Sequence, residues 1–192
     1  VDLRTLAHAW KYDRADAVAL MATAITVLVI GVEAGILVGI AVSLTAYLWR
    51  TSRPHLAIVG QVPGTEHYRN VLRHRVLTRP EILAVRVDES LYFVNARFLE
   101  NRVATLVAEH PDARHVVLIC SAVNLIDASA LETLAVINEN LMASGVQLHL
   151  AEVKGPVMDR LAKVGFLDRL SGEVFLSTHA AMQALSIKED HR

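Results

Sequence analysis

The sequence predicts an α/β protein, a mixed β-sheet covered by helices, preceded by a membrane-embedded helical hairpin. A long apolar stretch near the start of the chain, between Asp16 and Arg50, contains Glu33 as its single charged side chain. The apolar run 115–120 is typical of a central strand that is covered on both faces. Beyond residue 95, segments with helical spacing alternate with short strand signals, and this alternation favours an α/β domain.

Composition limits the functions open to this chain. Lys and Arg total 19 against 20 Asp and Glu, which gives a formal net charge of -1. We therefore expect no nucleic-acid partner, because binding to nucleic acid needs a basic surface. The single cysteine, Cys120, has no internal disulfide partner and lies in an apolar run. We therefore expect the Cys120 thiol to be buried and the protein to lie in a reducing compartment.

The apolar stretch is too long for one membrane crossing. A single helix over residues 17–50 would measure about 50 Å, whereas the hydrocarbon core of a bilayer is about 30 Å thick. Glu33 divides the stretch into two segments of about 24 Å each. The sequence therefore predicts a helical hairpin at residues 17–50, with its turn at Glu33. Glycines spaced by four would permit close helix packing if they share one helical face: Gly31, Gly35 and Gly39.

Basic residues flank the hairpin on both sides, and such residues favour the cytoplasmic face of a membrane. They are Arg4, Lys11, Arg14, Arg50 and Arg53. Both ends of the hairpin are therefore predicted to be cytoplasmic, with residues 1–16 as a loop leading into the membrane and residues 51–192 as a separate domain. Val1 is not an initiator methionine, so we expect protein upstream of this chain.

The domain after residue 51 shows strand and helix signals in the order β-β-β-α-β-α-β-α-β-α. A hairpin is predicted from strands 82–87 and 91–94, with residues 88–90 as its turn. The other predicted strands are 56–59, 115–120, 147–152 and 174–176, and the predicted helices are 96–109, 130–143, 156–164 and 179–187. Such an order requires a mostly parallel or mixed sheet with right-handed crossovers in its parallel units.

Several stretches resemble the C-terminal part of SulP (SLC26-like) anion transporters. The membrane segment VEAGILVGIAVSL and the following SRPHLAIVGQVPGTEHYRN are similar to the last transmembrane hairpin and the link into the STAS domain. Three further stretches resemble the STAS domain of these transporters, which is similar to anti-sigma-factor antagonists. They are SLYFVNARFLENRV, VVLICSAVNLIDASALETL and LAEVKGPVMDRLAKVGFLDRL. The order and spacing of these stretches, over nearly the whole chain, carry the resemblance.

The resemblance implies transport of sulfate, bicarbonate or related anions by the whole protein, and no enzymatic activity. It places the protein in a membrane, expected to be the bacterial inner membrane, with a cytoplasmic STAS domain for regulation and assembly. The substrate site of the family lies upstream of residue 1, so we assign no substrate ligand and no cofactor here. The implied partners are the upstream membrane domain, a second protomer in a homodimer, a cytoplasmic regulatory protein and the lipid bilayer.

Ser129 is the one position with candidate chemistry. The resemblance places it, with Asp127 in the same loop, where anti-sigma-factor antagonists carry a phosphorylatable serine, although Ala128 and Ala130 depart from the Ser and Gly typical of those proteins. The residues alone give a second interpretation, because Ser129 and Glu132 form an S-x-x-E capping box. We favour capping as the main role of Ser129. The alternative function is a membrane-tethered STAS regulatory protein that is switched by phosphorylation at Ser129.

The remaining polar residues give no further site. The histidines lack HExxH or other metal-ligand spacing, and we find no Ser-His-Asp or Cys-His arrangement, so no metal site and no catalytic residue is predicted. The basic stretch 68–75 is interpreted as a solvated loop or short helix. It can also face the cytoplasmic surface of the transporter or anionic lipid headgroups.

Overall fold

The computed structural model describes Trp10 and residues 14–190. The chain divides into two compact units, Val1–Arg53 and Pro54–Arg192. Most of the segment 1–16, predicted as a loop, lies outside the described residues. Its last three residues, from Arg14, already belong to the first described helix of the hairpin.

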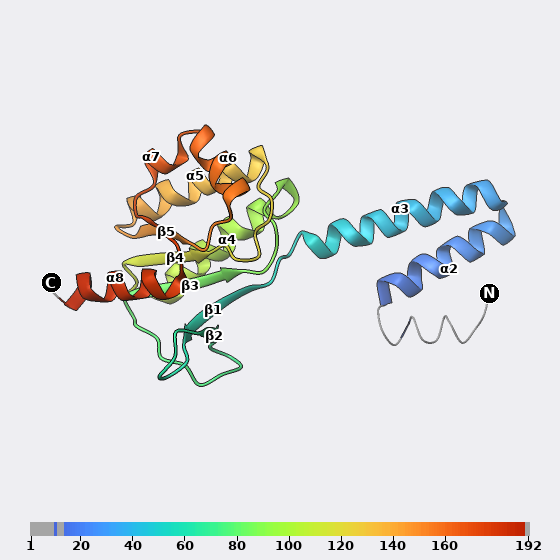
Figure 1. Ribbon diagram of the computed structural model, residues 1–192. Helices are drawn as coiled ribbons and strands as arrows, with labels where there is room; N and C mark the ends of the chain where they lie inside the picture. Colours follow the sequence, from blue (N-terminus) through green and yellow to red (C-terminus); the bar gives the residue numbers. More distant parts are fainter. Residues whose placement is uncertain (1–9, 11–13, 191–192) are drawn as a thin grey trace. The chain divides into compact units, whose positions relative to one another are not determined.

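The first unit is a helical hairpin of α2 (Arg14–Val29) and α3 (Val32–Thr51) (Figure 1). The chain reverses at Gly31, whose φ of 134° is one that residues with a side chain rarely adopt. The prediction of a turn at Glu33 was wrong by two residues, because Gly31 permits the reversal and Glu33 lies in the first turn of α3. An acidic residue there is favoured by the positive end of the helix dipole.

Two of the three spaced glycines set how closely the helices approach. A Cβ atom at Gly39 would lie 2.5 Å from Thr23 Oγ1, and one at Gly35 would overlap the Val27 side chain. Both positions therefore require glycine at the present separation of the helices. Gly31 does not share this face, because it lies before the first residue of α3.

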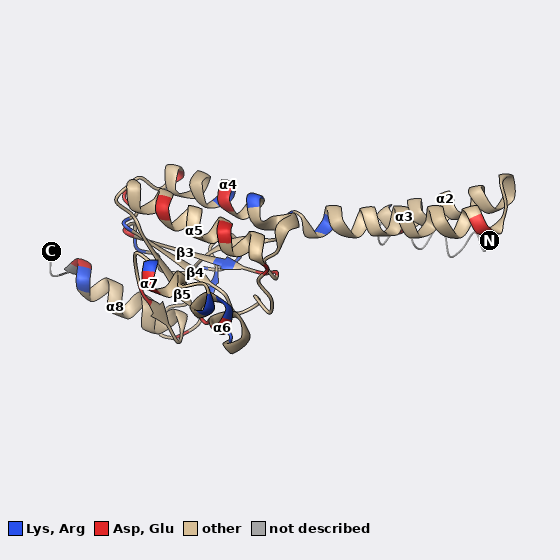
Figure 2. Cartoon of the chain, turned by 90° about the horizontal axis from the view of Figure 1, so that it is seen from above, with Lys and Arg blue, Asp and Glu red and all other residues tan. Residues whose placement is uncertain are grey.

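The surface of this unit is apolar. Figure 2 shows α2 and α3 almost free of charged residues, with a basic residue near the end of α3 that leads into the second unit. Large apolar side chains are exposed on both helices, among them Leu28 (83%) and Leu37 (69%). Of the described helices, α3 alone is long and apolar enough to cross a membrane: it has 20 residues, and an 18-residue window within it has a mean hydropathy of 1.7.

The second unit is built on a six-stranded sheet of order β2-β1-β3-β4-β5-β6. Strands β3 to β6 are parallel, whereas β1 runs antiparallel to both of its neighbours. The strands are β1 (Leu56–Gln61), β2 (Tyr68–Asn70), β3 (Ile82–Val87), β4 (His115–Ile119), β5 (Gln147–Ala151) and β6 (Val174–Phe175). All five residues of β4 are buried, which confirms the prediction of a central strand.

Helices cover both faces of the sheet (Figure 1). On one face, α4 (Phe93–Glu109) and α5 (Ala128–Ala143) pack against each other over a large apolar core, which α6 (Gly155–Lys163) and α7 (Phe166–Arg169) extend. On the other face, α8 (Thr178–Asp190) covers a smaller core that includes Val117, Ile119 and Leu185. The predicted mixed sheet covered by helices is therefore present.

The predicted strand 91–94 is wrong. Leu91 forms an isolated parallel bridge with Ile126, and α4 already begins at Phe93. The third strand of the β-β-β start is instead β2, which the sequence analysis assigned to a loop or short helix. The run Tyr68-Arg69-Asn70 has no strand-like alternation of its own and pairs with β1 through Val59, Gly60 and Gln61.

Candidate functional site

The loop that contains Asp127 joins β4 to α5 at the carboxyl ends of the parallel strands. Neighbouring segments hold it on two sides. The Asn124 N–H donates to Ser90 Oγ at 3.2 Å, Lys154 Nζ donates to Asn124 Oδ1 at 2.5 Å, and Arg160 Nη1 donates to the Ile126 carbonyl at 2.5 Å. The connection before α4 and the helix α6 thus fix the loop between them.

Asp127 binds the amino ends of two helices at once. Its Oδ1 accepts from the Ala130 N–H at 2.8 Å, which caps α5, and its Oδ2 accepts from the Phe93 N–H at 2.8 Å, in the first turn of α4. A carboxylate is favoured at both positions, because helix amino termini present unpaired N–H groups and partial positive charge. One side chain therefore locks the two helices that cover the larger core.

Ser129 is not the cap that the sequence analysis assigned. Because α5 begins at Ala128, after its N-cap Asp127, Ser129 lies within the first turn and its side chain is exposed. Its carbonyl accepts from Thr133 Oγ1 at 2.9 Å. The predicted capping box of Ser129 and Glu132 is therefore wrong. Asp127 is the N-cap instead, so the helix starts earlier than predicted. The hydroxyl of Ser129 is free for a role other than capping.

Two exposed apolar residues lie close to this loop and were not identified as site residues from the sequence. Phe93, whose backbone binds Asp127, is 67% exposed, and Leu125 is 44% exposed. The sequence analysis placed Phe93 in a strand, so its position beside Asp127 was not foreseen. Exposed apolar side chains therefore occur near Ser129 at this end of the domain, one in the loop and one at the start of α4.

A polar cavity of about 370 Å³ lies on the α8 face, at the carboxyl ends of the strands. Its lining includes Arg86 and Glu152, whose charges are opposite. Glu152 has a φ of 57°, and its Oε1 accepts from the N–H and the hydroxyl of Thr178, at 3.2 and 2.6 Å, where α8 begins. The hydrogen bonds from Thr178, at the start of α8, thus hold Glu152 in this unusual backbone conformation.

Arg86 is paired with a carboxylate. It donates through Nε and Nη2 to Asp88, at 2.5 and 3.0 Å, and His55 Nδ1 lies 2.7 Å from the same carboxylate. Burial alone would raise the pKa of Asp88, but the hydrogen bonds from Arg86 and His55 outweigh it and leave that pKa below its usual value. Within the described residues, no group of three or more His, Cys, Asp or Glu could hold a metal ion.

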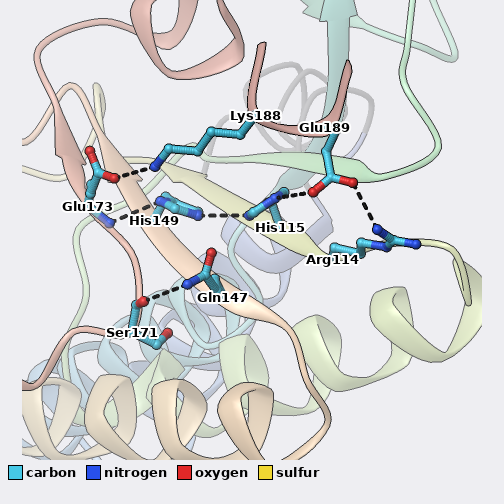
Figure 3. A network of polar contacts seen from close by, with 8 residues as sticks. All are labelled: Arg114, His115, Gln147, His149, Ser171, Glu173, Lys188 and Glu189. Atoms are coloured by element: carbon cyan, nitrogen blue, oxygen red, sulfur yellow. Dashed lines mark hydrogen bonds and ion pairs between the residues drawn. The ribbon is translucent and has the colours of Figure 1, made fainter. Parts of the chain in front are cut away.

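A chain of buried polar groups joins β4, β5 and α8 under the carboxyl end of that helix (Figure 3). The Glu173 N–H donates to His149 Nδ1 at 3.0 Å, so this nitrogen carries no proton. The His149 Nε2–H then donates to His115 Nδ1 at 3.1 Å, and the His115 Nε2–H donates to Glu189 Oε1 at 3.2 Å. One backbone donor therefore sets the tautomers of both imidazoles.

The surroundings of His149 disfavour its charged form. Burial lowers its pKa most, and the neighbouring His115 and Lys188 lower it further, against an opposite effect of Glu173, to about 4. A second proton on His149 would have to displace the Glu173 N–H. Protonation of His149 would therefore break its contact with the backbone just before β6.

The fold defines a class of α/β domain: the family model "STAS domain" matches residues 74–181. The chain therefore belongs to the STAS domain family.

The chain is also similar to named transporters. It is 31% identical to "Probable sulfate transporter 4.2" of Arabidopsis thaliana, over 95% of this chain and 29% of that protein. It is 30% identical to "High affinity sulfate transporter 2" of Stylosanthes hamata, over 95% of this chain and 29% of that protein. The resemblance to SulP transporters is thus confirmed, and the chain spans about 30% of the length of these relatives.

Solved structures share the fold. The murine Slc26a9 anion transporter in the inward-facing state matches with a TM-score of 0.81 at 19% identity, over 93% of this chain and 30% of that chain. The STAS domain of a SulP transporter from Vibrio cholerae matches with a TM-score of 0.51 at 18% identity, over 64% of this chain and 94% of that chain. The first match extends over both units of this chain.

The double cap gives a first prediction. Asp127→Ala is expected to lower the free energy of unfolding by about 2 kcal/mol, since each lost helix cap costs about 1 kcal/mol. Ser129→Ala is the matched control and should change stability by less than about 0.5 kcal/mol, as an exposed substitution without a cap. Urea denaturation measures both, and equal losses in the two variants would contradict the assignment of the cap to Asp127.

The histidine relay gives a second prediction. The unfolded chain protonates His149 near pH 6.5 and the folded chain near 4, so the unfolded state binds more protons between these values. Stability should therefore be full above pH 6.5 and fall as the pH decreases toward 4, by up to about 1.4 kcal/mol per pH unit.

His149→Asn tests this dependence, because the amide oxygen can replace Nδ1 as an acceptor but does not titrate. Urea midpoints measured from pH 7 to 4.5 should fall less steeply in this variant than in the native chain. His67→Asn changes an exposed histidine and is the control. An unchanged slope in His149→Asn would show that the dependence arises elsewhere.

Proposed function

We propose that this chain is the C-terminal part of a SulP-type anion transporter, and that its STAS domain serves regulation and assembly of the whole protein in the cytoplasm. The observation that carries the proposal is the similarity to sulfate transporters over 95% of the chain, across both the hairpin and the domain. A free-standing STAS domain would match such proteins only after residue 53.

The hairpin has the dimensions and composition of a bilayer segment. With 20 residues α3 is about 30 Å long, which equals the hydrocarbon thickness, whereas α2 with 16 residues is about 24 Å long. Trp49 and the guanidinium of Arg53, whose Cζ lies 5.1 Å from the centre of the indole ring, suit the interface between lipid and water. The basic residues at this end support a cytoplasmic position for the domain. The proposed membrane is the inner membrane of a bacterium.

Sulfate is the proposed substrate class, together with related oxyanions such as bicarbonate, and the role is not enzymatic. We assign substrate binding to the membrane region upstream of this chain. The proposed partners are that region, a second protomer and a cytoplasmic regulatory protein, for which the apolar surface around Phe93 and Leu125 offers a contact site.

Removal of the domain tests this proposal. In proteoliposomes that contain the full-length protein, deletion of residues 54–192 is expected to reduce uptake of labelled sulfate severalfold and to weaken association of protomers, measured by cross-linking. The amount of inserted protein is the control. Unchanged uptake, association and membrane delivery would contradict a role in regulation and assembly.

The alternative is a membrane-tethered STAS regulator that is switched at Ser129. The observation that favours it is the exposed position of Ser129 in the first turn of α5, with the cap supplied by Asp127. A phosphoryl group there would add about two negative charges beside Asp127 and the apolar surface that includes Phe93. This change would alter what the surface can bind.

Mass spectrometry of the protein from cells tests the alternative. It requires phosphate on Ser129, and Ser129→Asp should release a captured partner that Ser129→Ala retains. Absence of the modification under all growth conditions, together with equal capture by both variants, would exclude the switch.

A further inference from the structure

The segment that begins within β2 is basic and carries no acidic residue. Residues 69–79, here called the basic segment, contain four arginines and one histidine: Arg69, His74, Arg73, Arg75 and Arg79. All five of these side chains are exposed. The chain as a whole has a net charge of -1, so this concentration of positive charge is a local feature.

Hydrogen bonds hold an apolar residue outward at the tip of the basic segment. Asn70 Oδ1 accepts from the Leu72 N–H at 2.8 Å, and the Asn70 carbonyl accepts from the N–H groups of Arg73 and His74, both at 3.1 Å. Leu72 is nevertheless 89% exposed. An ordered turn thus presents a leucine to solvent between Arg69 and Arg73.

The sheet fixes both ends of the segment. The Val71 N–H donates to the Ile58 carbonyl at 3.1 Å, and Leu77 exchanges two backbone hydrogen bonds with Gln61, at 2.8 and 2.9 Å. Leu77 is itself 60% exposed. β1 therefore fixes the backbone of the basic segment at two points, and Leu72 and Leu77 are both exposed on it.

The basic segment lies beside the start of the domain. β1 begins at Leu56, five residues after α3 ends at Thr51, and a fully extended chain of that length spans at most about 18 Å. Val71 binds Ile58, the third residue of β1. If α3 spans the bilayer, as the proposed function requires, the chain itself keeps the start of β1 near the membrane surface.

We propose that the basic segment binds the anionic lipid surface next to which α3 emerges, with Leu72 inserted among the headgroups. Arginine guanidinium groups pair with lipid phosphates in a planar, bidentate geometry, and the cytoplasmic leaflet attracts basic segments close to the membrane. Insertion would remove the Leu72 side chain from water. The inference rests on the proposed function, because it takes α3 as the anchor.

A fluorescent probe at the tip tests the contact. The whole chain with Leu72→Cys is labelled with an environment-sensitive maleimide and inserted into phosphatidylcholine vesicles, with or without phosphatidylserine. Cys120 should not react, because it is buried and its pKa is raised to about 12 by burial and by Glu152. Phosphatidylserine is expected to shift the emission to shorter wavelength, and high salt should reverse the shift.

Two controls make the result specific. The same label at Met142→Cys, an exposed apolar position on α5, should not respond to phosphatidylserine. Replacing Arg73 and Arg75 by Gln should lower the ratio of bound to free segment about fivefold for each charge. The charge-matched pair Arg97→Gln and Lys163→Gln, at exposed positions on α4 and α6, should leave the ratio unchanged.

Alkaline extraction of the same vesicles separates this inference from the proposed function. A chain that resists extraction while the label at residue 72 ignores phosphatidylserine would overturn the lipid contact alone. A label that is equally shielded in both kinds of vesicle would indicate a protein contact and would also overturn it. A chain that is extracted would instead contradict the anchor and, with it, the proposed function.

Discussion

The architecture of the domain depends on β4, a strand buried along its whole length between two parallel neighbours. Its five residues pair with β3 on one side and with β5 on the other. Because parallel strands need crossover connections, the chain must pass over a face of the sheet between them, and right-handed crossovers bring α4 and α5 to the same face. The loops that follow β3, β4 and β5 therefore meet at one edge, where the candidate site lies.

Asp127 fixes the positions of the helices α4 and α5 at this edge of the sheet. A loop at the end of a strand is ordered when its polar backbone groups find partners, and here one carboxylate satisfies the amino ends of α4 and α5. The position of Ser129 follows from that bond rather than from its own side chain. The distance between the exposed serine and the apolar Phe93 is thus controlled by a residue that binds the backbones of both helices.

Much of the fold was predictable because its signals are local. The run 115–120 is apolar throughout, and the helix after residue 127 shows regular helical spacing, so β4 and α5 were predicted within two residues of their observed ends. By contrast, β2 is three polar residues that exist as a strand only through β1. The start of α4 likewise depends on Asp127, which is 34 residues away from Phe93. Long-range contacts of this kind leave no periodic pattern in the sequence, so neither feature could be predicted from it.

The candidate site was predictable in part for the same reason. Asp127 and Ser129 were identified, but the S-x-x-E spacing gave the cap to Ser129, since sequence spacing cannot rank two neighbouring caps. The histidines were given no role from the sequence. Two of them, His115 and His149, lie on neighbouring strands and meet only because the register places Val117 opposite His149. Their alternation with Val116 and Leu148, which face the larger core, is the signal that could have placed both on the α8 face.

Helices cover the two faces of the sheet unequally. The larger core is shared by α4, α5, α6 and α7, so movement of any one helix would expose residues packed by the others. On the opposite face, α8 alone among the described helices covers Val117, Ile119 and their neighbours. It is held at one end by Glu152 and at the other by Glu189, both of them carboxylates with polar partners. Loss of either contact therefore acts first on α8, which takes no part in the larger core beneath Asp127 and Ser129.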